Sequence, residues 1–378
     1  MRIIIAGSGA AAVEAARHVR RHDPDSTITV FSAEKLFPYR RPLLPGLLNL
    51  PEPPEHFYIH NKEFYEQNSI EVKLGSAAIR VDPLSNELYL QDGKVEKFDR
   101  LLLAIGSRAV KIPISGSSNL LRTVHNYDDI LYLKQELPNC RHVLIVGGGV
   151  LGLELADKIL KMGIKVTVAE RQNRLLSNFL DESSHLFLQH LLRRVEGLTL
   201  LRNCQLQSLQ PDSPGINCHL RSTAVHLLKA DMVIAATGTI ANTVQWPDNC
   251  GIVRLETDKY LQVKNFKNIF AAGDCIFTPG QYSGIYRQAV LQGAIAGTNM
   301  LGLQREYIPP VPQLRTAFMN IKLFCAGNTA DPELQCKQYV TDDSLQHLYY
   351  SPTTGKLQGC ILINNLENAD DFYQAISS

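Results

Sequence analysis

Short apolar runs alternate with segments of helical composition along most of the chain, and this alternation starts twice from the same pattern. The first round has an apolar, β-branched run over 2–6, a glycine-containing turn, a helix over 11–21 and a strand over 26–31. The second round repeats this order with a strand, a helix and a strand over 143–146, 151–162 and 165–169. Each round is a βαβ unit, because a glycine turn joins a strand to a helix and a second strand follows. The pattern therefore predicts an α/β protein with two parallel sheets.

Further apolar runs complete the predicted organisation. Three of them end at or near glycine, over 101–105, 231–236 and 269–272, and a long helix is expected over 283–300. Prolines at 309, 310 and 312 mark a boundary. Beyond it, strand-like runs over 348–350 and 359–363 precede an acidic helix over 368–376, which predicts a small α+β domain.

Composition and charge restrict the class of function. The 378 residues are 45% hydrophobic and carry a net charge of +1, without a dense basic block, which argues against nucleic acid as a partner. No run of about 18 apolar residues suggests a membrane span, and a strand that begins at Arg2 leaves no room for a signal peptide. The eight cysteines are scattered without a CxxC pair, so we expect reduced thiols, no metal site and a cytoplasmic location.

The two glycine turns carry the candidate chemistry. The first glycine of such a turn permits a tight bend, the second lets the backbone approach a pyrophosphate, and a small third residue lets helix and strand pack closely. The following helix offers free N–H groups and a positive dipole end to the phosphates. The residues expected to bind are Gly7, Gly9, Ala10 and Ala12 in the first turn, and Gly147, Gly149, Val150, Leu151 and Gly152 in the second.

A carboxylate at the end of the next strand selects the coenzyme. Glu170 follows the strand over 165–169, where a carboxylate accepts hydrogen bonds from the adenosine ribose and repels a 2′-phosphate. The second site is therefore expected to prefer NADH over NADPH, although the neighbouring cation of Arg171 works against this preference. After the first turn the corresponding position is Ser32, so Glu34 is the expected ribose partner there.

Five signatures in this order resemble the pyridine nucleotide–disulfide oxidoreductase superfamily and cover about residues 1–305. They are the first turn, Leu103–Arg108, the segment 147–156, Ala235–Gly238 and Ile269–Asp274. The resemblance implies FAD at the first turn, with Asp274 on the ribityl or phosphate side of the flavin, and NAD(P)H in an inserted second domain. Residues carried over to these sites are Ala104, Gly106, Arg108 and Gly273 for FAD, and Gly238 for NAD.

The resemblance also implies the fold class and the domain boundaries. We expect two Rossmann-like, three-layer dinucleotide-binding domains plus a small α+β C-terminal domain. The FAD-binding domain would be discontinuous, over 1–112 and 239–305, the NAD(H)-binding domain would cover 113–238, and the C-terminal domain would cover 306–378.

The absence of a cysteine in the region expected beside the flavin distinguishes between branches of the superfamily. Disulfide-using members need a redox cysteine beside the flavin, whereas the first cysteine of this chain is Cys140, well past that region. The loop from Phe37 to Leu44 instead resembles the Pro-Tyr-x-Arg/Lys-Pro-x-Leu segment of rubredoxin-, ferredoxin- and nitrite reductase-type NADH reductases. This implies that Arg41 and Pro42 lie against the flavin, and Glu154 is carried over as a carboxylate near the nicotinamide.

The implied function is an FAD-containing, NADH-dependent reductase that passes electrons to a redox protein such as rubredoxin or ferredoxin. Hydride transfer between stacked rings needs proximity and orientation, which the protein supplies. The chain departs from the family pattern at three places. Pro45-Gly46 replaces Ser-Lys, Ile105 replaces a threonine and Ala241 replaces a proline, and these departures bear on the electron acceptor more than on the cofactors. Two alternatives stay open: a reductase of a small molecule, quinone or oxygen, and a non-catalytic flavoprotein that senses NADH in regulation or assembly. A homodimer also stays open.

Overall fold

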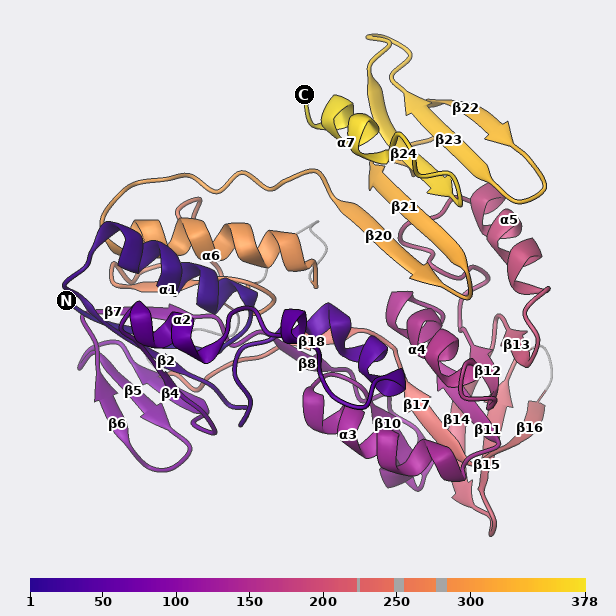
Figure 1. The fold of residues 1–378 in the computed structure, drawn as a ribbon, viewed down its shortest axis with the longest axis horizontal. Coiled ribbons are helices and arrows are strands. Elements are labelled where there is room, and N and C mark those ends of the chain that lie inside the picture. Colours follow the sequence, from indigo (N-terminus) through magenta and orange to yellow (C-terminus); the bar gives the residue numbers. More distant parts are fainter. Residues whose placement is uncertain (223–224, 248–254, 277–283) are drawn as a thin grey trace. The chain divides into compact units, whose positions relative to one another are not determined.

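The computed structural model describes residues 1–222, 225–247, 255–276 and 284–378, which fall into two units (Figure 1). Unit 1 consists of Met1–Leu44, Glu52–Arg108 and Thr239–Pro309. Unit 2 consists of Pro45–Pro51, Ala109–Gly238 and Pro310–Ser378.

Unit 1 is built on a parallel sheet with the strand order β19-β7-β1-β2-β3. These strands are β1 (Arg2–Ala6), β2 (Thr27–Phe31), β3 (Ile70–Lys73), β7 (Arg100–Leu103) and β19 (Ile269–Ala271). The helices are α1 (Ala10–His22), α2 (Lys62–Gln67) and α6 (Tyr286–Met300). A small antiparallel sheet of β4 (Ala78–Asp82), β5 (Glu87–Leu90) and β6 (Val95–Lys97) and the pair β8 (Ser107–Ala109) and β18 (Thr239–Ala241) complete it.

Helices α1 and α6 pack closely because α6 carries two glycines four residues apart. A Cβ atom on Gly293 would lie 2.2 Å from the carbonyl oxygen of Ala11, and one on Gly297 would lie 2.5 Å from that of Ala15. No side chain fits at either position, so the two backbones touch directly. This packing holds α1 in place, and the N-terminus of α1 is the first glycine turn.

Unit 2 has a second parallel sheet, in the order β10-β17-β11-β12-β13. Its strands and helices are β10 (Leu121–Thr123), β11 (His142–Val146), β12 (Lys165–Ala169), β13 (Leu198–Leu201), β17 (Met232–Ala235), α3 (Tyr127–Glu136), α4 (Val150–Leu160) and α5 (Glu182–Leu192). A further sheet contains β9 (Ser115–Gly116), β14 (Gln205–Pro211), β15 (Ile216–Arg221) and β16 (Val225–Ala230).

The C-terminal residues of unit 2 form an antiparallel sheet in the order β20-β21-β24-β23-β22, with one helix. These elements are β20 (Gln313–Phe318), β21 (Ile321–Gly327), β22 (Gln335–Val340), β23 (Leu345–Tyr350), β24 (Leu357–Ile363) and α7 (Ala369–Ser377). One buried apolar cluster joins this sheet to α4 and α5, since it contains Leu153 and Leu188 together with Phe318 and Ile361. The C-terminal sheet therefore shares a hydrophobic core with the second parallel sheet's helices.

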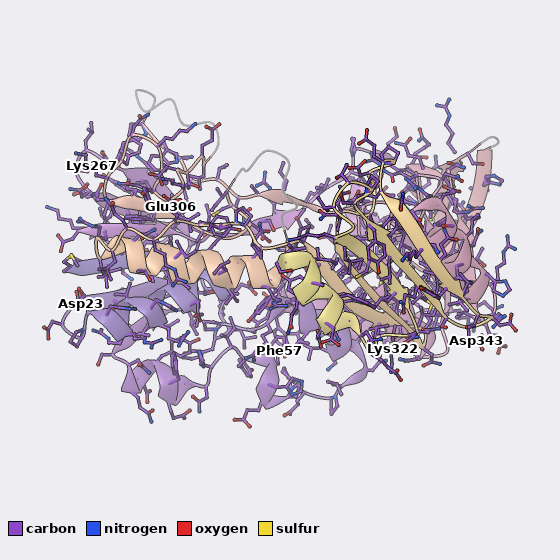
Figure 2. All side chains as sticks on the ribbon, turned by 90° about the horizontal axis from the view of Figure 1, so that it is seen from above. Asp23, Phe57, Lys267, Glu306, Lys322 and Asp343 are labelled. Atoms are coloured by element: carbon purple, nitrogen blue, oxygen red, sulfur yellow. The ribbon has the colours of Figure 1, made fainter. Side chains whose placement is uncertain are left out.

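Both predicted βαβ units are present, and the α/β fold class is confirmed. The sequence pattern missed the 3-10 helical turns over Arg41–Asn49, which begin inside the loop from Phe37 to Leu44, and three of the five C-terminal strands. At the surface, charged side chains such as Lys267 and Asp343 point away from the ribbon (Figure 2). Among the described helices, none combines the length and apolar character needed to cross a membrane.

Candidate functional site

The first glycine turn has one closed side and one open side. Gly7 has a φ of +107°, and a Cβ atom there would lie 2.0 Å from the carbonyl oxygen of Ala104 at the end of β7. A Cβ atom on Gly9 would meet nothing within 4 Å, and no side chain caps the N-terminus of α1 at this residue. Free N–H groups beside open space are what a pyrophosphate requires, so this turn fits the phosphates of a dinucleotide.

The second turn repeats this geometry in unit 2. Gly147 has a φ of +114°, and a Cβ atom there would lie 2.3 Å from the carbonyl oxygen of Ala236. Gly149 again faces open space and precedes the uncapped N-terminus of α4. A Cβ atom on Gly152 would lie 2.0 Å from the carbonyl oxygen of Gly147, so the third glycine allows α4 to pack onto its own turn. Gly147 and Gly152 therefore lie where a side chain would clash with the backbone, whereas Gly149 leaves open space at the N-terminus of α4.

The predicted residues Glu34 and Arg41 lie together after β2. The Glu34 carboxylate accepts hydrogen bonds from the Tyr39 hydroxyl at 2.7 Å and from the Arg41 guanidinium at 2.8 Å. Ser32 is linked to Ser8 of the first turn by a hydroxyl–hydroxyl distance of 2.8 Å. A carboxylate has about four acceptor positions, so Glu34 keeps capacity for a ribose hydroxyl.

The later flavin signatures meet the first turn at one edge of the sheet in unit 1. Parallel strands β1, β7 and β19 end at this edge, and a Cβ atom on Gly273 would lie 3.3 Å from the Cβ of Ala11. Asp274 accepts hydrogen bonds from the backbone N–H of Gly284 at 3.0 Å and from the Ser107 hydroxyl at 3.3 Å. Ligands of parallel α/β sheets bind at such carboxyl edges.

Two polar side chains that sequence reasoning missed support these turns. The amide of Asn242 donates to the carbonyl oxygens of Ile105 and Ser107 at 2.9 and 3.0 Å, on either side of Gly106. Gln292 of α6 accepts the backbone N–H of Gly273 at 2.7 Å. Arg108, which the sequence did predict, donates to the carbonyl oxygen of Ala241 at 3.1 Å. These contacts join residues more than a hundred positions apart in several cases, so no local pattern could reveal them.

Glu170 is tied to the second glycine turn. Its carboxylate accepts the backbone N–H of Gly148 and that of Gln172, both at 2.8 Å. This places the carboxyl group directly beside the turn, as ribose recognition requires. Gly238 ends the signature after β17 with a φ of +96°, and its carbonyl oxygen accepts the backbone N–H of Val110 at 3.0 Å.

Glu154 lies on the second turn of α4, where it meets the C-terminal sheet. Its carboxylate accepts the hydroxyl of Thr316 at 2.6 Å. Burial raises the pKa of Glu154, and the hydrogen bond from Thr316 and the charge of Lys158 only partly oppose this rise. Thr316 was not foreseen, because nothing local marks a strand threonine as the partner of a helix carboxylate.

The described cysteine of unit 1, Cys275, has an unreactive thiol. Cys275 is buried, and its thiol donates to the carbonyl oxygens of Leu103 and Ala272, both at 3.3 Å. Burial raises the pKa of the Cys275 thiol to about 12, so it stays protonated at neutral pH. All cysteines within the described ranges are free thiols, and no group of three or more acidic, histidine or cysteine residues there could hold a metal ion.

Comparison with known proteins identifies the class. The chain belongs to the pyridine nucleotide-disulphide oxidoreductase family, whose sequence profile matches residues 1–293. It is therefore an NAD(P)H-dependent oxidoreductase, a class whose cofactors are FAD and NADH or NADPH.

Two relatives and one solved structure show the extent of the similarity. NADH-rubredoxin oxidoreductase of Clostridium acetobutylicum is 28% identical over 327 residues, which cover 85% of this chain and 80% of the relative. The nitric oxide reductase FlRd-NAD(+) reductase of Salmonella gallinarum is 28% identical over 349 residues, covering 91% and 90% of the two chains. A ferredoxin reductase from Rhodopseudomonas palustris has the same fold, with a TM-score of 0.85 at 21% identity, over 98% of this chain and 92% of that one. The predicted family, enzyme class and cofactors are confirmed.

Proposed function

We propose that this chain is an FAD-containing, NADH-dependent reductase that passes electrons from NADH, through the flavin, to a separate redox protein of the rubredoxin or ferredoxin type. The observation that carries the proposal is the repeated turn geometry. Both turns combine a glycine that no other residue can replace with a glycine open to a ligand. The names of the two relatives, one acting on rubredoxin and one on FlRd, support the class of acceptor.

The residues of unit 1 are assigned to FAD as part of this proposal. Backbone N–H groups at Gly9 and Ala10 would hold the pyrophosphate, while Gly7 and the small, buried Ala12 would shape the turn. Glu34 would accept from the ribose, Arg41 and Pro42 would contact the flavin side, and Asp274 would accept from the ribityl chain. Ala104, Gly106, Arg108 and Gly273 would complete the edge of the sheet. FAD supplies the capacity to accept a hydride and to release electrons onward.

The residues of unit 2 are assigned to NADH. Gly147 and Gly152 would shape the turn, while the N–H groups of Gly149, Val150 and Leu151 would face the pyrophosphate. Glu170 would select NADH over NADPH, Gly238 would border the coenzyme, and Glu154 would orient the nicotinamide. The proposal retains the FAD-binding domain at 1–112 and 239–305, the NAD(H)-binding domain at 113–238 and the C-terminal domain at 306–378. It also retains a cytoplasmic location.

Anaerobic mixing of the FAD-loaded protein with NADH tests the proposal. We expect the visible flavin absorbance to bleach, and oxidised rubredoxin or ferredoxin to restore it faster than a quinone or oxygen does. Failure of NADH to bleach the flavin would refute the enzymatic function and favour an NADH-sensing role. Fastest reoxidation by oxygen, a quinone or another small molecule would refute the protein acceptor while leaving the reductase half intact.

A further inference from the structure

A threonine of the C-terminal sheet holds the carboxylate assigned to the nicotinamide. The Thr316 hydroxyl of β20 donates to Glu154 of α4 at 2.6 Å, and both residues belong to unit 2. Within the described part of the chain, no other group donates a hydrogen bond to this carboxylate. The orientation of Glu154 therefore depends on a residue outside the dinucleotide-binding fold.

The strand that carries Thr316 is fixed to α4 at a second point. Met319 and Asn320 form the turn between β20 and β21 with φ values of 49° and 62°, as in a tight hairpin. The backbone N–H of Met319 donates to the buried carboxylate of Asp157 at 2.8 Å. Asp157 lies one helical turn after Glu154, so two contacts hold the strand against the helix. Thr316 is itself only 9% exposed, and its β-branched side chain restricts the direction of the hydroxyl.

The two carboxylates on this helix face have different partners. The Asp157 carboxylate forms ion pairs with Lys158 at 2.8 Å and with Lys161 at 3.0 Å. Glu154 takes the neutral hydroxyl, while Arg315, the residue before Thr316, pairs with Asp370 of α7 at 2.6 Å. The charged groups of α4 and β20 near Glu154 are thus paired with other residues. The ionised form of Glu154 is therefore stabilised by one neutral hydrogen-bond donor, Thr316, and by the charge of Lys158, which pairs with Asp157.

We propose that Thr316 is a positioning residue, whose hydroxyl holds Glu154 on the second turn of α4, where the nicotinamide half of the coenzyme is expected. This inference rests on the proposed function. It assigns a role to the C-terminal sheet that requires no contact between that sheet and the coenzyme. The C-terminal domain would contribute to the affinity of the coenzyme site through one hydrogen bond.

Thr316→Val tests this role, because valine keeps the shape of the side chain and removes the donor. Loss of the donor disfavours the ionised carboxylate, so the pKa of Glu154 should rise further. We expect NAD⁺ to bind about three- to tenfold more weakly at neutral pH. The reason is that Glu154, without the hydrogen bond from Thr316, is less well oriented toward the nicotinamide. Thr316→Ser should bind NAD⁺ within about twofold of the wild type.

Two measurements on the FAD-loaded protein separate positioning from damage to the fold. Calorimetric titration with NAD⁺ across neutral pH gives the dissociation constant, and carbon-13 NMR follows the Glu154 carboxyl, which is identified by its absence in Glu154→Gln. In the Glu154→Gln background, Thr316→Val should add less than about a twofold effect. The matched control is Thr29→Val, which removes another threonine–glutamate hydrogen bond, to Glu71 at 3.1 Å in unit 1, and should leave NAD⁺ binding unchanged.

The proposal is overturned if Thr316→Val leaves both the Glu154 titration and the affinity for NAD⁺ as in the wild type. An equal loss of affinity in the Glu154→Gln background would also overturn it, because the effect would then bypass the carboxylate. These outcomes differ from failure of the proposed function, which is a lack of flavin reduction by NADH in the wild type. Binding of NAD⁺ and titration of Glu154 are measured without turnover, so each test gives its own answer.

Discussion

At the scale of single residues, Glu170 combines two tasks at the second turn. Its carboxylate accepts the N–H of Gly148 within the turn and the N–H of Gln172 beyond it. The same group is assigned to the adenosine ribose. Substitutions at this position therefore change both the support of the turn and the recognition of the coenzyme.

Glu170→Arg is expected to raise KM for NADH about tenfold or more and to lower KM for NADPH, because a cation replaces the ribose acceptor and attracts a 2′-phosphate. Steady-state kinetics with both coenzymes measure this exchange of preference. Arg171→Ala keeps the carboxylate and should leave KM for NADH within about twofold. An unchanged KM for NADH in Glu170→Arg would show that the ribose contact lies elsewhere.

At the scale of elements, the contact between α1 and α6 controls where the first turn lies. Gly293 and Gly297 bring the α6 backbone against Ala11 and Ala15 of α1. A stripe of small residues lets two helices approach more closely than side chains would allow. The turn that is assigned to the FAD phosphates is the direct continuation of this packed helix.

Gly293→Ala is expected to lower the free energy of unfolding of unit 1 by about 1–3 kcal/mol and to weaken retention of FAD, because the added methyl group forces α6 away from α1. The free energy of unfolding is measured by denaturant titration followed by the fluorescence of Trp246. This residue is the single tryptophan and lies in unit 1. In the control Gly46→Ala the added methyl group meets nothing within 4 Å, so the substitution should cost less than about 1 kcal/mol. Because Gly46 lies in unit 2, the unfolding of this control is followed by circular dichroism. Wild-type stability in Gly293→Ala would contradict the packing argument.

At the scale of the whole molecule, the C-terminal sheet belongs to unit 2. A cluster of polar side chains next to the shared core connects this sheet to α5. Asp181 accepts the Tyr349 hydroxyl at 2.7 Å, and His347 Nδ1 lies 3.0 Å from the Ser184 hydroxyl and 3.4 Å from Asp181. Serine, histidine and aspartate also form hydrolytic triads, but here both partners contact the same ring nitrogen of a buried histidine. The group is therefore structural.

Acid should weaken unit 2 through Asp181. Burial alone would raise the pKa of Asp181, but hydrogen bonds involving His347, Ser184 and Tyr349 outweigh it and hold this pKa well below its usual range. A depressed pKa contributes stability that is present above the unfolded value, about 3.9, and is lost as pH falls below it. We expect Asp181→Asn to unfold more easily at neutral pH and to lose less stability than the wild type between about pH 5 and pH 3.

Circular dichroism during denaturant unfolding at several pH values measures this difference. Trp246 fluorescence serves as the internal control, because it reports on unit 1 and should respond equally in both proteins. Parallel curves of stability against pH for Asp181→Asn and the wild type would show that the Asp181 group does not carry the acid sensitivity.

The two βαβ units and their glycine turns were predictable because they depend on local physics, and the family followed from the resemblance of five motifs. Positive φ at Gly7 and Gly147, an open second glycine and the period of apolar residues all act within a few positions of the chain. Glu170 was likewise predictable, since its place follows from the length of one βαβ unit.

Tertiary structure alone decided the partners of these elements. Thr316 and Glu154 are 162 residues apart, and His347 and Ser184 are 163 residues apart, so their pairing depends on how the C-terminal sheet packs onto α4 and α5. The same holds for Gly293 against Ala11, where the need for glycine arises on another helix. Such contacts leave no periodic trace in the sequence, because each is set by packing between distant segments and not by the backbone preference of either residue.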